Sequence, residues 1–200
     1  VKDGAVILGS SSVRYAEEIA AFLSIPESER GKIVTVFGTS GLDEFNYAIH
    51  VVEAIGGLIG TGAVSTRYAG RGEVDGQACE TFLIKYANGA TGVYNAFMGV
   101  WQPFEVVIMT TKSTYQFRIQ TGKVYGQLLD RICDYMETGK NDLAPITTIT
   151  ESIRIMLAGR ISREQGGKEI KIADIPENDP GFDGTEFARG YAKAASKIYL

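Results

Sequence analysis

The sequence contains few of the residues from which metal sites and disulfide-bonded folds are built: its 200 residues include one histidine and two cysteines. Two cysteines, Cys79 and Cys133, are too few for a disulfide framework, and we interpret them as buried thiols of a cytoplasmic protein. The single histidine has no second histidine or nearby cysteine that could complete a zinc site. No metal site is therefore expected.

The sequence also lacks an excess of positive charge and a long apolar run. Lysine and arginine number 20 against 24 aspartates and glutamates, which gives a net charge of −4. A nucleic-acid-binding face needs a cluster of basic residues, and none is evident. No apolar stretch is long enough to span a bilayer, and the first residues do not have the pattern of a signal peptide. These absences predict a cytoplasmic protein with no nucleic-acid partner and no membrane association.

The residues that are present provide enough apolar material for a sizeable core, because 44% of them are hydrophobic. Apolar residues recur at three- and four-residue steps over residues 12–24 and 43–58, which predicts two amphipathic helices. Between them, residues 32–37 are rich in β-branched side chains and flanked by glycines, as expected of a strand.

Further along, the apolar period changes to two, which is typical of strands. Strands are predicted over residues 63–68, 77–86, 91–100, 104–110 and 114–119. Short links such as Asn88-Gly89 favour antiparallel neighbours. Next come predicted helices over residues 123–137 and 149–163, the second opened by a capping box at Thr148, then a strand over 169–172 and a C-terminal helix that includes Phe187.

These elements predict the α+β class: a large, mostly antiparallel open sheet of about six strands with helices packed on one face. We expect a single domain over residues 1–200. Within it, residues 1–30 form the first helix region, 31–175 the sheet and its helices, and 176–200 a Pro/Asp/Gly-rich linker with the C-terminal helix.

The only histidine, His50, lies inside the second predicted helix. Asn46 lies four residues before it and Glu53 three residues after it, so the three side chains share one side of the helix. An imidazole suits proton transfer near neutral pH, because its ordinary pKa lies there. A half-buried histidine whose second nitrogen is satisfied by a neighbour explains the same spacing, and spacing alone favours that explanation.

A run of three serines, Ser10 to Ser12, precedes the first predicted helix, with Arg14 in its first turn. Serine hydroxyls and free amides at a helix start can bind an anion or a polyol, and Arg14 adds a forked set of donors. Ordinary helix capping by Ser11 or Ser12, with Arg14 on a solvated face, is an equally good interpretation.

The glycine-rich stretch over residues 56–62 is interpreted as a helix end and turn, because it follows a helix rather than opening one. No other segment has the context of a nucleotide-binding loop. The strand over 91–100 carries large apolar side chains on both faces, which predicts that a second subunit covers the open face of the sheet. A curled sheet that shields itself is the alternative.

Three short stretches carry a resemblance to a known family. They are Ser10-Ser11-Ser12-Val13-Arg14-Tyr15-Ala16-Glu17-Glu18, Tyr47-Ala48-Ile49-His50-Val51-Val52-Glu53 and Thr110-Thr111-Lys112-Ser113-Thr114-Tyr115. In order and spacing the chain resembles the C-terminal, substrate-side domain of the glucose–fructose oxidoreductase / inositol dehydrogenase (Gfo/Idh/MocA) family. Members of that family join an N-terminal Rossmann domain, which binds NAD or NADP, to an α+β domain with a large open sheet.

The resemblance implies a substrate-binding and oligomerisation domain of an NAD(P)-dependent oxidoreductase that acts on a sugar, an inositol or a related polyol. It implies catalytic roles for His50 and Asn46. It implies substrate-binding roles for Arg14, Ser12, Tyr15, Tyr47 and Glu53. NAD or NADP would belong to the full-length protein, and no cofactor is expected to bind tightly to these 200 residues. A homo-oligomer through the open sheet face is expected.

Two departures from the family pattern bear on activity. The commoner family helix reads Asp-x-Gly-x-His, whereas Asn46 and Ala48 occupy the corresponding positions here, and an amide cannot act as a carboxylate. The Rossmann domain and its Glu-Lys-Pro motif with the catalytic lysine are absent from this sequence, so we expect the chain alone to be inactive. The alternative functions are a non-catalytic ligand-binding and oligomerisation module, and an independent α+β domain whose resemblance is coincidental.

Overall fold

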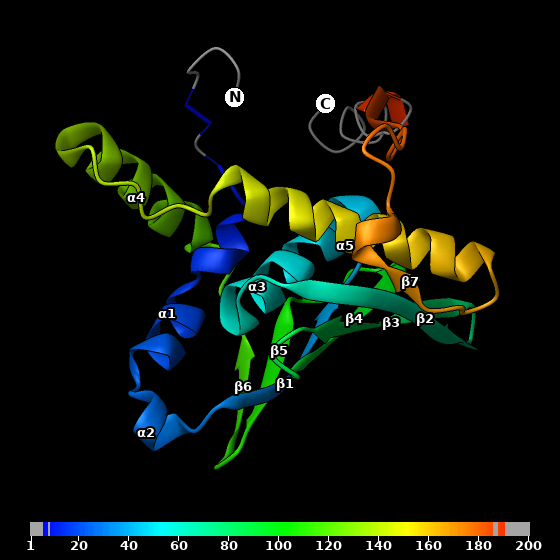
Figure 1. Cartoon of the computed structure of the whole chain (residues 1–200), viewed down its shortest axis with the longest axis horizontal. Coiled ribbons are helices and arrows are strands. Elements are labelled where there is room, and N and C mark those ends of the chain that lie inside the picture. Colours follow the sequence, from blue (N-terminus) through cyan, green and yellow to red (C-terminus); the bar gives the residue numbers. More distant parts are fainter. Residues whose placement is uncertain (1–5, 8, 186–187, 191–200) are drawn as a thin grey trace.

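The computed structural model describes residues 6–7, 9–185 and 188–190 (Figure 1). The first third of the chain forms the 3-10 turn η1 (Ser12–Tyr15), α1 (Glu17–Ser24), α2 (Glu27–Arg30), β1 (Ile33–Ser40), the π-helical turn η2 (Glu44–Ala48) and α3 (Ile49–Ile59). There follow β2 (Ala63–Val74), β3 (Gln77–Tyr86), β4 (Thr91–Met98), β5 (Glu105–Thr110), β6 (Thr114–Arg118), α4 (Val124–Thr138), α5 (Ile146–Glu164), β7 (Ile170–Lys171) and the 3-10 turn η3 (Ile172–Asp174).

The described strands form one open sheet of seven in the order β6-β5-β1-β4-β3-β2-β7. The predicted α+β class is confirmed, and the sheet is mostly antiparallel as expected. One pair differs, because β1 runs parallel to β4 while it is antiparallel to β5 on its other side. The connection from β1 passes through α3, and such a crossover allows a parallel neighbour that a short link cannot provide.

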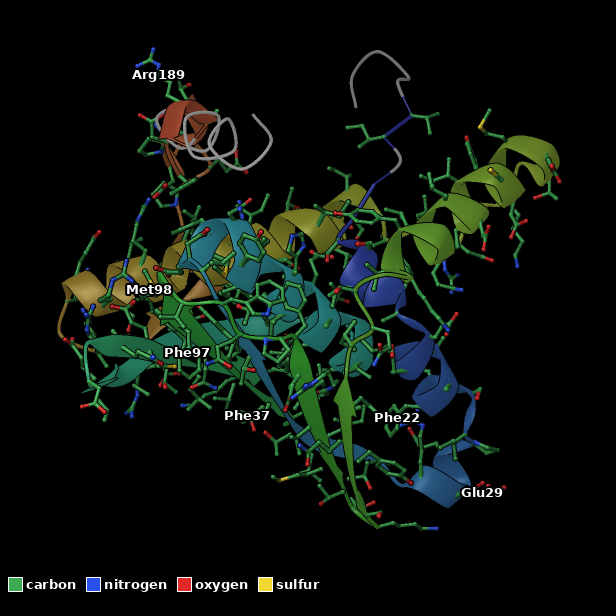
Figure 2. All side chains as sticks on the ribbon, turned by 180° about the vertical axis from the view of Figure 1, so that it is seen from behind. Phe22, Glu29, Phe37, Phe97, Met98 and Arg189 are labelled. Atoms are coloured by element: carbon green, nitrogen blue, oxygen red, sulfur yellow. The ribbon has the colours of Figure 1, made fainter. Side chains whose placement is uncertain are left out.

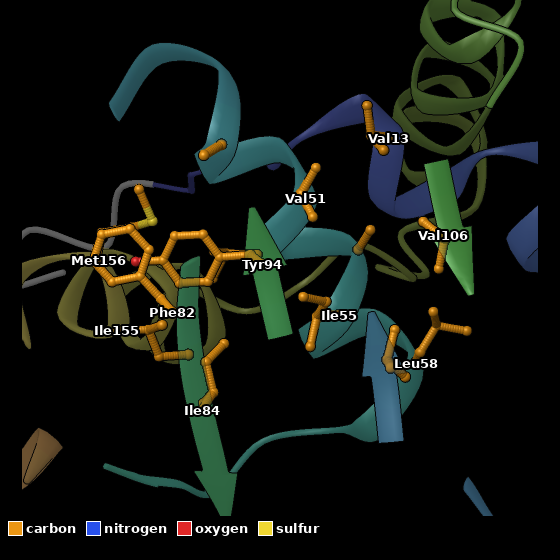
Figure 3. Packing of buried hydrophobic residues seen from close by; sticks show 14 of the residues in the cluster. Val13, Val51, Ile55, Leu58, Phe82, Ile84, Tyr94, Val106, Ile155 and Met156 are labelled. Atoms are coloured by element: carbon orange, nitrogen blue, oxygen red, sulfur yellow. The ribbon is translucent and has the colours of Figure 1, made fainter. Parts of the chain in front are cut away.

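The helices α3 and α5 lie on the same side of the sheet, so one face is covered as predicted (Figure 1). The rings of Phe82 and Tyr94 stack beneath them with centroids 4.6 Å apart, and Met156 of α5 lies beside them (Figure 3). A side chain on Gly92 would bring its Cβ within 2.7 Å of Ile55 Cγ2. This glycine lets α3 approach β4 closely, which fixes the position of the helix that carries His50.

The opposite face of the sheet carries a row of apolar side chains across four strands. Strand register aligns Val107, Phe37, Val93 and Leu83, and they alternate with residues that face the helices. Phe37 is exposed and the other three are half-buried (Phe37 is labelled in Figure 2). No helix in the described part of the chain covers them, which agrees with the predicted open sheet with helices on one face. A second subunit over this face stays a prediction.

The first predicted helix, over residues 12–24, is in fact two elements. Ala16 adopts an extended backbone with ψ of 143°, so the 3-10 turn η1 ends there and α1 starts at Glu17. The second predicted helix begins with a π-helical turn rather than an α-helical one. The Ala48 amide donates to the Asp43 carbonyl five residues earlier, at 3.2 Å.

Two smaller expectations are wrong. The capping box at Thr148 does not form, because α5 begins two residues earlier, after Pro145, and the Thr148 amide donates to the Pro145 carbonyl at 2.9 Å. The cysteines are not buried thiols, since Cys79 is half-buried and Cys133 is exposed. The C-terminal helix predicted from Phe187 falls largely outside the described residues. Among the helices that are described, none combines the length and apolar character needed to cross a bilayer.

Candidate functional site

A pocket of about 530 Å³ opens beside the start of α3. Four parts of the chain form its walls: the serine run and η1, the turn η2 with the start of α3, the link between β4 and β5, and the start of α4. The polar residues on its walls are Ser10, Ser11, Ser12, Asn46, His50 and Thr121. Aromatic and aliphatic side chains complete the lining, which is therefore partly polar and partly apolar.

His50 is held at the pocket wall by contacts on three sides. Its ring nitrogen Nδ1 lies 2.9 Å from the hydroxyl oxygen of Ser11. That hydroxyl also accepts a hydrogen bond of 3.2 Å from the Val13 amide, as the cap of η1. The rings of Tyr47 and Phe104 stand nearly perpendicular to the imidazole, with centroids 6.4 and 5.8 Å away. These contacts fix the plane of the ring.

The electrostatics of the pocket favour a neutral imidazole. Burial lowers the pKa of His50 below its ordinary value, because the charged form loses hydration. The negative charges of Glu53 and Asp43 oppose this effect but do not overcome it. No described residue hydrogen-bonds the second ring nitrogen, Nε2. A neutral ring with one nitrogen fixed and the other unpartnered can accept or donate a proton toward the pocket.

Glu53 and Arg14 are placed behind the pocket wall rather than in the lining. Glu53 Oε2 accepts a hydrogen bond of 2.7 Å from Ser10 and lies 3.3 Å from Arg14 Nη1, which also donates to the Glu53 carbonyl at 3.1 Å. The side chains of the pair are only 12% and 4% exposed. Arg14 is thus not on a solvated face. The pair anchors the serine run to α3, and neither residue lines the pocket.

Tyr15 is also absent from the lining. It is buried, and its hydroxyl accepts a hydrogen bond of 2.7 Å from the Ala144 amide, just before α5. The Arg131 guanidinium of α4 lies 4.9 Å from the centre of its ring. Tyr15 therefore connects η1 to the later helices and shapes the pocket from outside it.

Asn46, Tyr47 and Ser12 do line the pocket, as does His50. The Asn46 amide nitrogen of the backbone donates to Asp43 Oδ1 at 2.5 Å, which caps η2. No hydrogen bond joins Asn46 to His50 among the described residues, so Ser11, not Asn46, contacts the imidazole. The sequence spacing predicted that His50 and Asn46 lie on one side of the helix, and both line the pocket. It did not predict that Ser11 hydrogen-bonds the imidazole.

Several lining residues come from segments that the sequence argument did not single out. Trp101, the only tryptophan, is 55% exposed and stands edge-on to Tyr47 at 6.4 Å between centroids. Phe104, Thr121, Val124, Tyr125 and Leu128 come from later in the chain. The signal that the sequence offered for this wall is its single tryptophan, in the link between two predicted strands.

The described residues supply no cradle for the pyrophosphate of a dinucleotide. The glycine-rich stretch 56–62 lies at the end of α3, where Gly60 and Gly62 have φ of 96° and 100°, as expected of a helix end. Of the described links, the one from β1 to η2 contains a single glycine, Gly41, and no Gly-x-Gly-x-x-Gly run joins a strand to a helix among these residues. Nor do the described His, Cys, Asp and Glu side chains gather in groups of three or more that could hold a metal ion.

Comparison with known proteins finds likeness in structure but not in sequence. No protein-family model matches the chain, and no curated protein matches it. A probable dehydrogenase from Thermotoga maritima superimposes with a TM-score of 0.72 at 11% identity, over 88% of this chain and 67% of that one. Myo-inositol dehydrogenase from Lactobacillus casei, in complex with NAD(H) and myo-inositol, gives 0.69 at 8% identity, over 88% and 65%.

A third structure, GenD2 from gentamicin A biosynthesis in complex with NAD, gives a TM-score of 0.66 at 13% identity, over 85% of this chain and 64% of that one. The chain therefore spans about two thirds of the length of these solved structures. At such low identity the likeness concerns the fold. The chain has the fold of the corresponding part of these structures, which include a probable dehydrogenase and a myo-inositol dehydrogenase solved with NAD(H).

Proposed function

We propose that the chain is the substrate-binding part of an NAD(P)-dependent oxidoreductase that acts on a sugar, an inositol or a related polyol, with His50 as its acid/base. The fold supports this proposal, because its neighbours include dehydrogenases solved with inositol and NAD(H). The observation that carries it is an imidazole fixed by Ser11 at the wall of a pocket lined by hydroxyl-bearing side chains, and burial lowers the pKa of that imidazole. A polyol can exchange hydrogen bonds with such a wall and rest its carbon skeleton on the apolar part.

The chemistry assigned to His50 is removal of the proton from a substrate hydroxyl. In the tautomer with the proton on Nδ1, the ring donates to Ser11 Oγ and leaves Nε2 as the acceptor. When Nε2 takes the hydroxyl proton, the imidazolium keeps its Nδ1–H bond to Ser11, and no alkoxide accumulates. A nicotinamide cofactor, held by residues other than those described, would take the hydride from the same carbon.

The remaining lining residues are assigned to orientation of the substrate. Asn46, Tyr47 and Ser12 line the pocket and carry polar side-chain groups, which are assigned to hydrogen-bond the hydroxyls that do not react. Arg14, Glu53 and Tyr15 are assigned to the support of that wall, because they lie outside the lining. This differs from the direct substrate contacts that the family resemblance implies for them.

The experiment that tests this function compares His50→Gln with the native enzyme, in the whole protein with its cofactor domain. Hydride transfer to NAD or NADP from a panel of inositols and sugars is followed by absorbance of the reduced nicotinamide. Loss of the acid/base is expected to lower kcat by about 10²–10⁴-fold with little change in KM. Turnover equal to that of the native enzyme on every active substrate would refute the role of His50.

The second candidate function is a non-catalytic module that binds a ligand and assembles through its sheet. The amide at Asn46 favours it, as does the apolar row of Val107, Phe37, Val93 and Leu83, which no described element covers. We propose that a second copy of the chain covers this row in a homo-oligomer. Sedimentation equilibrium distinguishes this assembly from a monomer, and Phe37→Glu is expected to disrupt it.

A further inference from the structure

The turn η2, which brings Asn46 and Tyr47 into the pocket, has an irregular backbone. Leu42, just before it, has φ of 71°, a conformation that a leucine rarely adopts. The Leu42 amide and carbonyl are both bound to the backbone of the loop after β4, through Val100 and Gly99 at 2.8 Å. A π-helical turn after such a residue is not a low-energy choice of the local backbone. The local cap from Asp43 is therefore supplemented by contacts from elsewhere in the chain.

Such a contact is a buried ionic cluster at Glu44, the first residue of η2. The Arg163 guanidinium, from the last turn of α5, lies 2.6 Å from Glu44 Oε2 and also hydrogen-bonds Glu80 Oε2 of β3. Glu44 and Glu80 are only 5% and 6% exposed. One arginine therefore joins η2, the sheet and α5, three elements that lie far apart in the sequence.

Burying the carboxylates of this cluster costs free energy of folding. Two buried carboxylates share one guanidinium, and burial raises the pKa of Glu44, with the nearby charge of Glu80 adding to the effect of burial. The second oxygen of Glu44, Oε1, is buried with no hydrogen-bond partner among the described residues. Buried ion pairs contribute little net stability compared with apolar packing, so a role in fixing one conformation explains the cluster better than a role in stability.

We propose that Arg163 is a positioning residue of the candidate site, which acts through Glu44 to hold η2, and with it Asn46, Tyr47 and the start of α3, against the sheet. This inference rests on the proposed function for its biological meaning, but the positioning itself can be tested without turnover. Arg163 does not line the pocket, so its effect must pass through the turn.

The matched control lies one turn earlier on the same helix. Arg160 also makes an ion pair from α5, with Asp179 Oδ2 at 2.9 Å. Its charge acts on Glu44 only through space, with no hydrogen bond or ion pair to η2 among the described residues. Arg163→Met and Arg160→Met each remove one guanidinium from an ion pair of this helix. A purely structural role for both arginines predicts similar effects on the site from the two variants.

The readout is the titration of His50 in the 200-residue chain, whose single histidine gives one imidazole Cε1–H signal in ¹H–¹³C NMR. In Arg163→Met the loosened turn lets water reach the ring, so the His50 pKa is expected to rise toward 6.5, while Arg160→Met leaves it unchanged. Arg163→Lys keeps the positive charge but not the two-pronged guanidinium. Its His50 pKa is therefore expected to lie between the value of the native chain and that of Arg163→Met.

If Arg163→Met does not fold, as judged by circular dichroism, Glu44→Gln replaces it, because Arg163 then keeps Glu80 as a partner. The same upward shift is expected, with a smaller size. A folded Arg163→Met or Glu44→Gln chain whose His50 pKa equals that of Arg160→Met would overturn the proposal. Failure of every polyol to bind the native chain would instead count against the proposed function and leave this test intact.

Discussion

The ion pair that anchors the serine run to α3 allows a quantitative prediction. Arg14→Met leaves the Glu53 carboxylate, 4% exposed, with Ser10 as its remaining side-chain donor. Leaving one member of a buried pair uncompensated costs about 3–5 kcal/mol. We expect a loss of that size in the free energy of unfolding, measured by urea denaturation at pH 7.

A companion double variant replaces both charges of this ion pair. In Arg14→Met with Glu53→Leu no uncompensated charge remains, so most of the stability is expected to return, to within about 2 kcal/mol of the native chain. Arg71→Met is the control, because Arg71 pairs with Glu73 on the surface, where the two side chains are 47% and 52% exposed. No measurable change in the free energy of unfolding is expected from this variant. If Arg14→Met has as little effect as Arg71→Met, the assignment of this pair as the anchor of the pocket wall is wrong.

Three further predictions concern the site, its packing and its open face. Because burial lowers the His50 pKa, the unfolded chain binds the proton more tightly than the folded chain does. The contribution of His50 to stability is therefore fully present above pH 6.5 and is lost as the pH falls through the lowered pKa. His50→Gln should flatten that part of the profile of urea midpoint against pH. Ser11→Ala should cost about 1 kcal/mol in urea denaturation as the η1 cap is lost, and should reduce the Nδ1–H tautomer seen by ¹⁵N NMR. Gly92→Ala should cost about 1–3 kcal/mol, because its Cβ would lie 2.7 Å from Ile55, and the thermal midpoint should fall accordingly.

The sheet was largely predictable because alternation is a local signal. The strand over residues 77–86 was predicted with the bounds that β3 has, and the helix-end interpretation of residues 56–62 is confirmed. The parallel pairing of β1 with β4 could not be predicted, because register across the sheet is set by packing of side chains far apart in the sequence. The π-helical start of the second helix is a similar case, since one of its contacts comes from Arg163, more than a hundred residues later in the chain.

The site was predictable in part for the same reason. Helical spacing correctly placed His50 and Asn46 near each other, but spacing cannot say which side chain completes a hydrogen bond. Ser11 contacts His50 across 39 residues, and Arg14 reaches Glu53 across the same separation. The family resemblance pointed to Arg14 and Glu53 as ligands of a substrate, whereas the fold pairs them with each other behind the pocket wall.

The most direct test of the account is titration of the native chain with myo-inositol and related polyols while the single His50 signal is followed by NMR. If the pocket binds such a molecule against a neutral imidazole, the His50 Cε1–H signal shifts in a saturable manner, and Ser12→Ala weakens the binding without moving the signal of the free chain. A His50 signal that stays fixed with every polyol up to saturating concentrations, while the chain remains folded, would contradict the assignment of this pocket as a polyol site.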